Sequence, residues 1–251
     1  MKIDRRRLVM TIIGAILLVL ALFGVIKAVE ALTTRKADTT EGLAIIKEQE
    51  SMDVQTIESK IQTMEAKEKA DAEAEANRTE KQMFVNSVVM GDSITQGFID
   101  YDVLESANVI AKIGVSIPDL SDAIETATNM NPDAIFLAYG MNDVLSTRGD
   151  ASIFKDEYKG LIDELKEKLP NSRIFVNAIF PVQQQEIDKE PLYKNLAEYN
   201  KTLEELCNEE QITFIDNSSL IVPEYYEEDG VHFKADFYPI WARNMAEVAS
   251  L

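Results

Sequence analysis

The hydrophobic and polar positions of this chain divide it into three parts. Residues 8–26 are uncharged and mostly apolar, residues 40–82 are rich in charged residues and alanine, and from residue 84 short apolar runs alternate with amphipathic stretches. As a helix rising 1.5 Å per residue, the first run is about 28 Å long, close to the thickness of the bilayer hydrocarbon. The pattern therefore predicts an N-terminal membrane span, a polar spacer and a folded domain.

The third part has the alternation of a parallel α/β domain. Continuous apolar runs predict five strands, and apolar positions spaced by three and four residues predict the helices between them. Strands buried on both faces are apolar throughout, so we expect a parallel sheet covered by helices on both sides. The predicted strands are residues 85–90, 109–113, 134–139, 173–178 and 213–215, and the main predicted helices are residues 119–129, 153–168, 193–209 and 235–249.

Polar residues follow the predicted strands at the edge where a parallel sheet binds its ligands. Residues 91–93 follow the first strand, Gly114 follows the second, and residues 140–143 follow the third. Residues 229–232 stand just before the last helix, in a loop that can return to the same edge. We therefore expect four separate segments to meet at one rim.

The residue types in these segments are those of acyl transfer to a serine. A serine hydroxyl needs a base to remove its proton, and His232 is the only histidine of the chain. Asp229, three residues earlier, is the carboxylate expected to orient the imidazole, with Glu228 as the alternative. Ser93, at a strand-to-helix turn, is the predicted nucleophile.

The same segments supply donors for the negative charge that develops on a substrate carbonyl oxygen. Ser93 and Gly114 can each present a backbone N–H, and Asn142 can present its side-chain amide. Asp92 and Asp143, beside these positions, are expected to be structural, with carboxylates that accept loop N–H groups. One histidine and scattered carboxylates give no spacing for a metal site, and we expect no cofactor.

Each of these residues also has an ordinary structural interpretation. Ser93 could cap the following helix, the glycines could form strand-end turns, and His232 could be a surface loop residue. The catalytic interpretation fails only if every one of these structural interpretations is correct at the same time, for segments that stand in the expected order. Residues 183–185, three glutamines in the connection after the fourth strand, are further candidates for lining a pocket.

In this order, residues 91–93, Gly114, residues 140–143 and residues 229–232 resemble the four sequence blocks of the SGNH (GDSL-like) hydrolase superfamily. The resemblance covers about residues 84–250. It implies a flavodoxin-like three-layer α/β/α sandwich with a parallel five-stranded sheet. It also implies a catalytic triad and an oxyanion hole, which map onto Ser93, His232 and Asp229 and onto Ser93, Gly114 and Asn142.

This family resemblance implies a serine esterase. Membrane-anchored proteins of this kind often act on acetyl or other small acyl esters of cell-envelope carbohydrate, so we expect that substrate class. The first alternative is an O-acyltransferase of the same fold, with a membrane-bound acyltransferase as partner. The second is a non-catalytic carbohydrate-binding or scaffold protein. The chain has no long apolar lid of the kind that a lipase pocket requires.

Charge around the first apolar run predicts its orientation. Four cations stand within residues 1–7, whereas the cations beyond the run are spread out. The positive-inside rule therefore predicts a cytoplasmic tail of residues 1–7, a signal anchor of residues 8–27 in the lipid bilayer, and a catalytic domain on the outer side of the cell membrane. Cleavage of the run as a signal peptide is the alternative.

Residues 28–82 are expected to form a helical stalk between the anchor and the hydrolase domain, residues 83–251. Apolar residues recur at spacings of three and four only over residues 54–64, which favours at most a weak coiled-coil self-association.

The composition excludes other classes of function. With 44 Asp and Glu against 25 Lys and Arg, the net charge is −19. Nucleic-acid binding needs clustered Lys and Arg, so no nucleic-acid partner is expected. Cys207 is the only cysteine, which rules out an intramolecular disulfide, and its amphipathic surroundings predict a buried thiol.

Overall fold

The structure, a computed structural model, describes residues 17–30, 40–50 and 54–251. The chain divides into two units, Met1–Glu73 and Ala74–Leu251. The second unit contains the whole α/β body.

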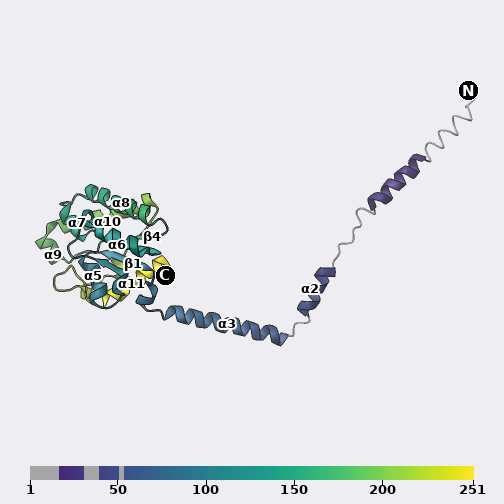
Figure 1. The fold of residues 1–251 in the computed structure, drawn as a ribbon, viewed down its shortest axis with the longest axis horizontal. Helices are drawn as coiled ribbons and strands as arrows, with labels where there is room; N and C mark the ends of the chain where they lie inside the picture. The colour runs from purple at the N-terminus through teal and green to yellow at the C-terminus, as the bar shows by residue number, and fades with distance from the viewer. Residues whose placement is uncertain (1–16, 31–39, 51–53) are drawn as a thin grey trace, which may run out of the picture. The chain divides into compact units, whose positions relative to one another are not determined.

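The segment before the α/β body is helical wherever the structure describes it (Figure 1). Residues 17–30 form one helix, and α2 (Thr40–Glu50) and α3 (Val54–Ala76) follow. No helix in the described part of the chain is long and apolar enough to cross a membrane. Residues 1–16, which include the tail and the beginning of the predicted anchor, lie outside the described residues.

The apolar positions of the predicted coiled-coil segment are exposed on α3. Ile57, Ile61 and Met64 are 37%, 49% and 69% exposed. An exposed apolar stripe of this length is compatible with pairing between copies, and self-association through residues 54–64 stays a prediction.

The second unit is built on one parallel sheet, as the apolar runs predict. Its strand order is β2-β1-β3-β4-β5, and every neighbouring pair is parallel. The order reverses between β1 and β3, and in doubly wound sheets ligands bind at the carboxyl ends of the two strands beside such a reversal. The strands are β1 (Ser87–Gly91), β2 (Val109–Ala111), β3 (Ala134–Ala138), β4 (Arg173–Asn177) and β5 (Thr213–Ile215).

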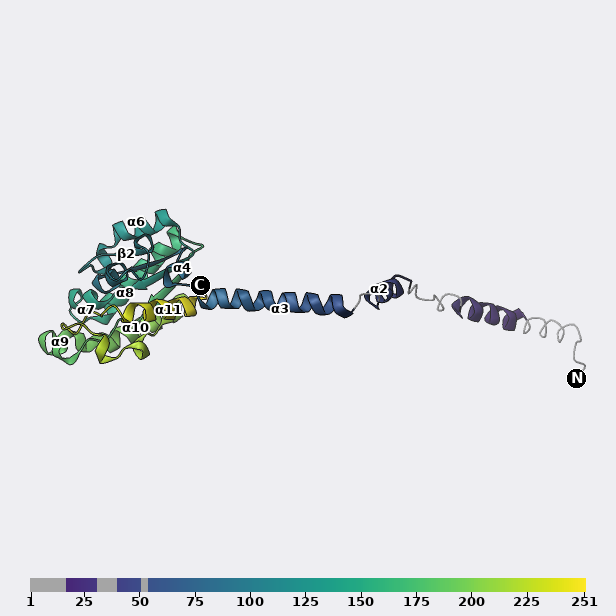
Figure 2. The same ribbon diagram turned by 90° about the horizontal axis from the view of Figure 1, so that it is seen from below.

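Helices cover both faces of this sheet (Figures 1 and 2). On one face, the rings of Phe98 and Trp241 join α5 to α11, with centroids 4.6 Å apart. On the other face, Phe154 and Tyr199 join α8 to α10 at 4.7 Å. The α-helices of these layers are α5 (Ser93–Asp100), α6 (Ser121–Met130), α8 (Ala151–Lys168), α10 (Leu196–Glu210) and α11 (Phe237–Ala249).

Two short helices at the functional edge were not predicted. α7 (Met141–Ser146) and α9 (Gln184–Lys189) have six residues each, too few to reveal a helical period in the sequence. The remaining short elements are α4 (Glu80–Met83), η1 (Ser106–Asn108), η2 (Ile117–Asp119), η3 (Pro191–Asn195), η4 (Ser218–Leu220) and η5 (Pro223–Tyr225).

Several predicted element ends are wrong by a few residues. The first strand begins at Ser87, because residues 84–86 form a turn that leaves Val85 65% exposed. The predicted helix over residues 193–209 begins at Leu196, after the 3-10 turn η3. Apolar character alone does not distinguish a strand from the turn that precedes it.

The core confirms the interpretation of the apolar runs. β1 is buried along its whole length, and Ala134, Ile135, Phe136 and Leu137 of β3 have no exposed surface. Cys207 is 1% exposed, and burial raises the pKa of its thiol to about 12. A thiol that stays protonated at neutral pH is a poor nucleophile, so Cys207 is a packing residue as predicted.

A buried polar network ties the last helix to the ends of two strands. The Asn177 side-chain oxygen accepts hydrogen bonds from Trp241 Nε1 (3.0 Å) and Asn217 Nδ2 (2.9 Å), and Asn177 Nδ2 donates to the Leu137 carbonyl. Asn177 and Asn217 are 1% and 0% exposed. Every member has a partner, so the network orients α11 without leaving a buried group unpaired.

Replacement of Asn177 by alanine is expected to destabilise the protein by about 3 kcal/mol, because it leaves the Trp241 and Asn217 donors unpaired in the interior. Urea unfolding monitored by tryptophan fluorescence measures the change. Asn208→Ala, at an exposed position of α10, is the control and should change stability by less than about 0.5 kcal/mol. Equal stability of the two variants would contradict the expectation.

Candidate active site

Ser93 lies where β1 turns into α5. Asp92 is the N-cap of this helix, and its carboxylate accepts the Ile94 N–H at 3.0 Å. Ser93 is therefore not the capping residue, which removes the ordinary interpretation of this serine. As the first residue of the helix it has a backbone N–H without an intrahelical acceptor, at the positive end of the helix dipole.

The side chains of Ser93, His232 and Asp229 form a chain of hydrogen bonds. His232 Nε2 lies 2.9 Å from Ser93 Oγ, and His232 Nδ1 lies 2.7 Å from Asp229 Oδ2. Asp229 is therefore the carboxylate beside the imidazole. Glu228 instead accepts a hydrogen bond from Gln185 through its backbone carbonyl. A base placed between a hydroxyl and a carboxylate is the arrangement that activates a serine.

Asp229 is held in its charged form by its own loop. Its Oδ1 accepts the backbone N–H groups of Val231 (2.9 Å) and His232 (3.0 Å). Partial burial raises the pKa of Asp229, but these donors and the imidazole outweigh it and bring the pKa below its usual range. The side chains of Asp229 and His232 remain 48% and 40% exposed, so the site is open to solvent.

The two further predicted oxyanion donors lie on the loop after β2 and on the short helix α7. Gly114 stands after β2 with a φ of +70°, a conformation that favours glycine, and open space surrounds the position of a Cβ there. The Asn142 amide, on α7, donates to the Val115 carbonyl at 3.0 Å and more weakly to Asp92 Oδ2 at 3.3 Å. These bonds connect α7 to the loop after β2 and to the turn at Ser93.

Asp92 and Asp143 are buried beneath this surface. Asp143 Oδ1 accepts the Ile117 N–H at 2.8 Å, which ties the loop after Gly114 to α7. Burial raises the pKa of Asp92 to about 6 and that of Asp143 to about 7. Asp143 Oδ2 has no hydrogen-bond partner within the described structure, which agrees with a costly buried charge.

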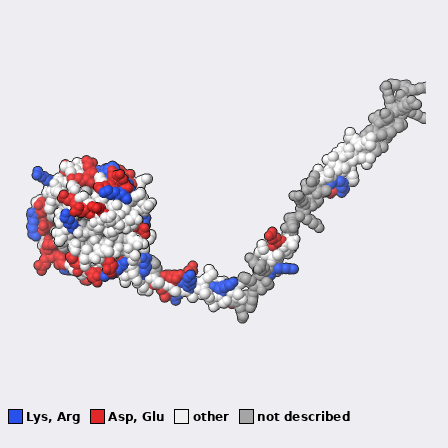
Figure 3. All heavy atoms as spheres, in the orientation of Figure 1, with Lys and Arg blue, Asp and Glu red and all other residues white. Residues whose placement is uncertain are grey.

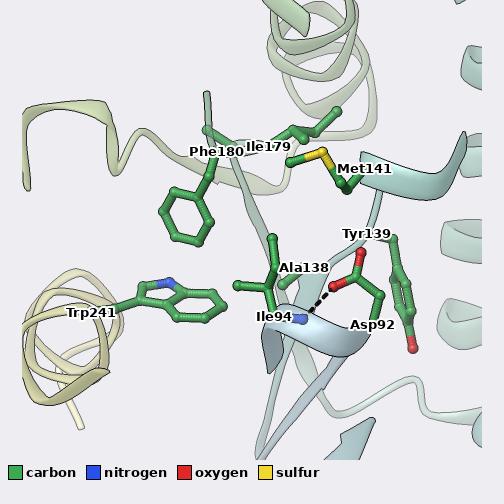
Figure 4. Close-up of a pocket in the computed structure, with 9 residues that line it drawn as sticks. Asp92, Ile94, Ala138, Tyr139, Met141, Ile179, Phe180 and Trp241 are labelled. Atoms are coloured by element: carbon green, nitrogen blue, oxygen red, sulfur yellow. Dashed lines mark hydrogen bonds between the residues drawn. The ribbon is translucent and has the colours of Figure 1, made fainter. Parts of the chain in front are cut away.

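A small cavity lies beside the nucleophile turn (Figure 4). Its volume of about 20 Å³ is enough for one water molecule or a group of similar size. The residues on either side of Ser93 both line it, so it adjoins the peptide that carries the nucleophile. The lining residues are Asp92, Ile94, Ala138, Tyr139, Met141, Ala178, Ile179, Phe180 and Trp241.

Residues 183–185, the candidates for lining a pocket, are not among the residues that line this cavity. Gln183 and Gln185 instead form hydrogen bonds with the loop that carries His232. Tyr101, which donates to Glu227 Oε1 at 3.2 Å, also reaches that loop and was not predicted as a site residue. Such contacts join residues more than 40 positions apart, and no local sequence pattern reveals them.

The charge of the surface agrees with the composition. Acidic side chains lie in several groups on the visible face of the α/β body in Figure 3, with basic side chains beside them and uncharged areas between the groups. In the described part of the chain, no group of three His, Cys, Asp or Glu side chains is placed to hold a metal ion.

The raised pKa of Asp143 predicts a pH dependence of stability. The native state binds a proton that the unfolded chain releases above its ordinary pKa of 3.8, so this contribution to stability is lost as pH rises towards 7. Asp143→Asn should therefore lose less stability than the wild type between pH 5 and pH 8, by about 2 kcal/mol. Urea unfolding at both pH values tests this, with Asp156→Asn on the exposed side of α8 as control. Parallel pH profiles of Asp143→Asn and wild type would contradict it.

Solved structures with similar folds share this architecture at low sequence identity. A GDSL-like lipase from Bacteroides thetaiotaomicron is 18% identical with a TM-score of 0.54, over 72% of this chain and 96% of that chain. A lipase/acylhydrolase from Enterococcus faecalis is 18% identical (TM-score 0.53; 65% and 94% covered), and a carbohydrate esterase family 3 protein from Talaromyces cellulolyticus is 15% identical (TM-score 0.51; 65% and 95% covered). These likenesses establish the fold.

Among curated protein sequences, none matches this chain significantly. The model of the GDSL-like Lipase/Acylhydrolase family, however, matches residues 89–239, well over half of the chain and the entire span from β1 into α11. The chain therefore belongs to the GDSL-like lipase/acylhydrolase family, a family of carboxylic ester hydrolases.

Proposed function

We propose that this enzyme is a serine esterase that removes acetyl or other small acyl groups from cell-envelope carbohydrate. The observation that carries the proposal is the hydrogen-bonded series from Ser93 Oγ through His232 to Asp229, at 2.9 and 2.7 Å. In this proposal Ser93 is the nucleophile, His232 the general base and Asp229 the residue that holds the imidazole in its reactive tautomer.

The proposed reaction proceeds in two steps. His232 Nε2 takes the hydroxyl proton as Ser93 Oγ attacks the ester carbonyl, and the imidazolium then returns this proton to the departing alcohol. This leaves an acyl-serine. A water molecule, deprotonated by the same imidazole, attacks the acyl-serine, and the proton passes back to Ser93 Oγ as the carboxylic acid leaves.

The negative charge on the carbonyl oxygen requires preorganised donors. We assign this role to the backbone N–H groups of Ser93 and Gly114 and to the amide of Asn142. The 3.3 Å hydrogen bond from Asn142 to Asp92 is the weaker of its two, so a substrate oxygen can replace it at small cost. Each such donor typically lowers the barrier by about 3 kcal/mol.

The small size of the acyl group is supported by the cavity beside Ser93. A space of about 20 Å³ accommodates the methyl group of an acetyl ester, whereas a butyryl chain requires its apolar walls to move. One protein of similar fold is a carbohydrate esterase, and this analogy of fold supports a carbohydrate substrate.

A location outside the cell membrane is part of the proposal. It rests on the uncharged run at residues 8–26 and on the cations that precede it. In this arrangement residues 8–27 are the anchor and residues 28–82 are a stalk that carries the α/β body.

Hydrolysis of p-nitrophenyl acetate by the full-length chain tests the catalytic assignment. Ser93→Ala and His232→Ala are each expected to lower kcat by at least about a thousandfold, because each removes a member of a unit that acts together. Ser121→Ala, an exposed serine on α6, is the matched control and should keep full activity. Turnover that survives both triad substitutions would refute the mechanism.

The acyl preference is tested with the same assay. We expect kcat/KM for the acetyl ester to exceed that for the butyryl ester by at least about tenfold, because two extra methylenes do not fit the cavity. Acylation of an added oligosaccharide without ester hydrolysis would favour the O-acyltransferase. An inactive wild type that binds oligosaccharide would favour the non-catalytic alternative.

A further inference from the structure

The base and its carboxylate belong to one small hairpin. An antiparallel bridge joins Tyr226 to Phe233, and the Glu227 N–H donates to the His232 carbonyl at 2.8 Å. The tip of this hairpin, residues 227–232, holds Asp229 and His232 three residues apart. Asp229 and His232 therefore keep their mutual geometry when the hairpin moves, whereas the distance from His232 to Ser93 depends on how the hairpin is held.

The connection after β4 forms hydrogen bonds with the tip of the hairpin on one side. The Gln183 N–H donates to the Gly230 carbonyl at 2.8 Å, and Gln185 Nε2 donates to the Glu228 carbonyl at 2.9 Å. Two backbone carbonyls of the tip, those of Glu228 and Gly230, are thus bound to the start of α9. Closer to the base of the hairpin, the Tyr226 hydroxyl donates to the Pro181 carbonyl at 2.7 Å.

The absence of a side chain at Gly230 allows the hairpin tip to lie close to Gln183 and Gln185. The φ of Gly230 is +75°, and a Cβ at this position would lie 3.0 Å from Gln183 Cβ and 3.0 Å from Gln185 Nε2. Gly230 is buried although its neighbours Glu228 and Asp229 are exposed. The tip therefore fits directly against the two glutamines, with no room for a side chain between them.

The helix that begins at Ser93 holds the tip from the other side. Tyr101, at the C-terminal end of α5, donates to Glu227 Oε1 at 3.2 Å and packs its ring on Tyr238, with centroids 5.2 Å apart. The hairpin is thus held between the element that carries the nucleophile and the connection that carries Gln185.

The Gln185 contact has little to offer the stability of the fold. Its side chain is exposed, and water competes for both the donor and the carbonyl. The contact does, however, help to set the distance from His232 Nε2 to Ser93 Oγ, because these two residues belong to segments far apart in the sequence. A positional role accounts for a hydrogen bond at this place better than a stabilising one.

We infer that Gln185 is a positioning residue for the reaction: through Glu228 and the adjoining Gly230 contact it holds the Asp229–His232 hairpin so that His232 Nε2 stays within hydrogen-bond distance of Ser93 Oγ. This inference rests on the proposed esterase function. It assigns no contact with substrate to Gln185, and it predicts an effect on turnover without an effect on substrate binding.

The test compares neighbouring glutamines in the full-length chain. Gln185→Leu removes the donor, Gln185→Glu removes it with little change of shape, and Gln185→Lys restores an N–H donor. Gln184→Leu is the matched control, because Gln184 is equally exposed and bonds only within α9, to Asp188. Steady-state kinetics with p-nitrophenyl acetate and hydrogen exchange of residues 226–233 are measured on all variants.

We expect Gln185→Leu and Gln185→Glu to lower kcat by about tenfold at unchanged KM, since loss of alignment acts on the chemical step. Amide exchange in the hairpin should become about fivefold faster in both variants. Gln185→Lys should recover most of the turnover, and Gln184→Leu should match the wild type in both measurements.

Three results would overturn the inference. Equal kcat in Gln185→Leu and Gln184→Leu removes the positional role, and a rise in KM at unchanged kcat makes Gln185 a substrate contact instead. If the wild type shows no esterase activity, the proposed function fails. Amide hydrogen exchange of residues 226–233 then still tests whether Gln185 holds the hairpin in place. Equal exchange in the two leucine variants then refutes it.

Discussion

The pairing of β1 with β3 determines where the chemistry of this enzyme can lie. The two strands run in register from Ser87 beside Ala134 to Gly91 beside Ala138, and both are buried. Because they are parallel and end at the same level, the turn at Ser93 and the beginning of α7 at Met141 emerge side by side. The chain order of the strands reverses here, so the loops diverge and leave the edge accessible.

The histidine reaches this edge by a longer route, since it is 139 residues from Ser93 in the sequence. A contact over such a separation must be supported by the rest of the fold. The Asn177 network fixes the helix that follows the histidine, and the carboxylates of Asp92 and Asp143 fasten the turns beneath the site. Burial raises the pKa of both carboxyl groups, so their ionisation in the folded state costs free energy. The fold accepts this cost because the two side chains hold the turns beneath the site.

Much of this arrangement could be predicted from the sequence because it follows from local patterns. Apolar runs identify the five strands, and the rule that ligands bind at the carboxyl ends of parallel strands brings residues 91–93, 140–143 and 229–232 together. The sequence leaves Glu228 as an alternative to Asp229, and the folded loop decides for Asp229, whose Oδ1 accepts two backbone N–H groups and whose Oδ2 lies beside His232.

The parts that could not be predicted depend on contacts between distant segments. α7 and α9 are too short to show a period, and the true N-cap of α5 is Asp92 because its carboxylate, not the hydroxyl of Ser93, reaches the Ile94 N–H. The glutamines at residues 183–185 look like polar lining in the sequence. Only the folded position of Gly230 reveals that two of them face the hairpin.

The exposure of the triad has a consequence for the size of the alcohol that the enzyme can release. The small cavity adjoins the residues on either side of Ser93, whereas the side chains of His232 and Asp229 are 40% and 48% exposed. The departing alcohol is therefore not enclosed, and its remainder can stay in bulk solvent. With the carbohydrate substrate that we propose, the enzyme would work at interior positions of a long polymer and would not have to thread a free chain end.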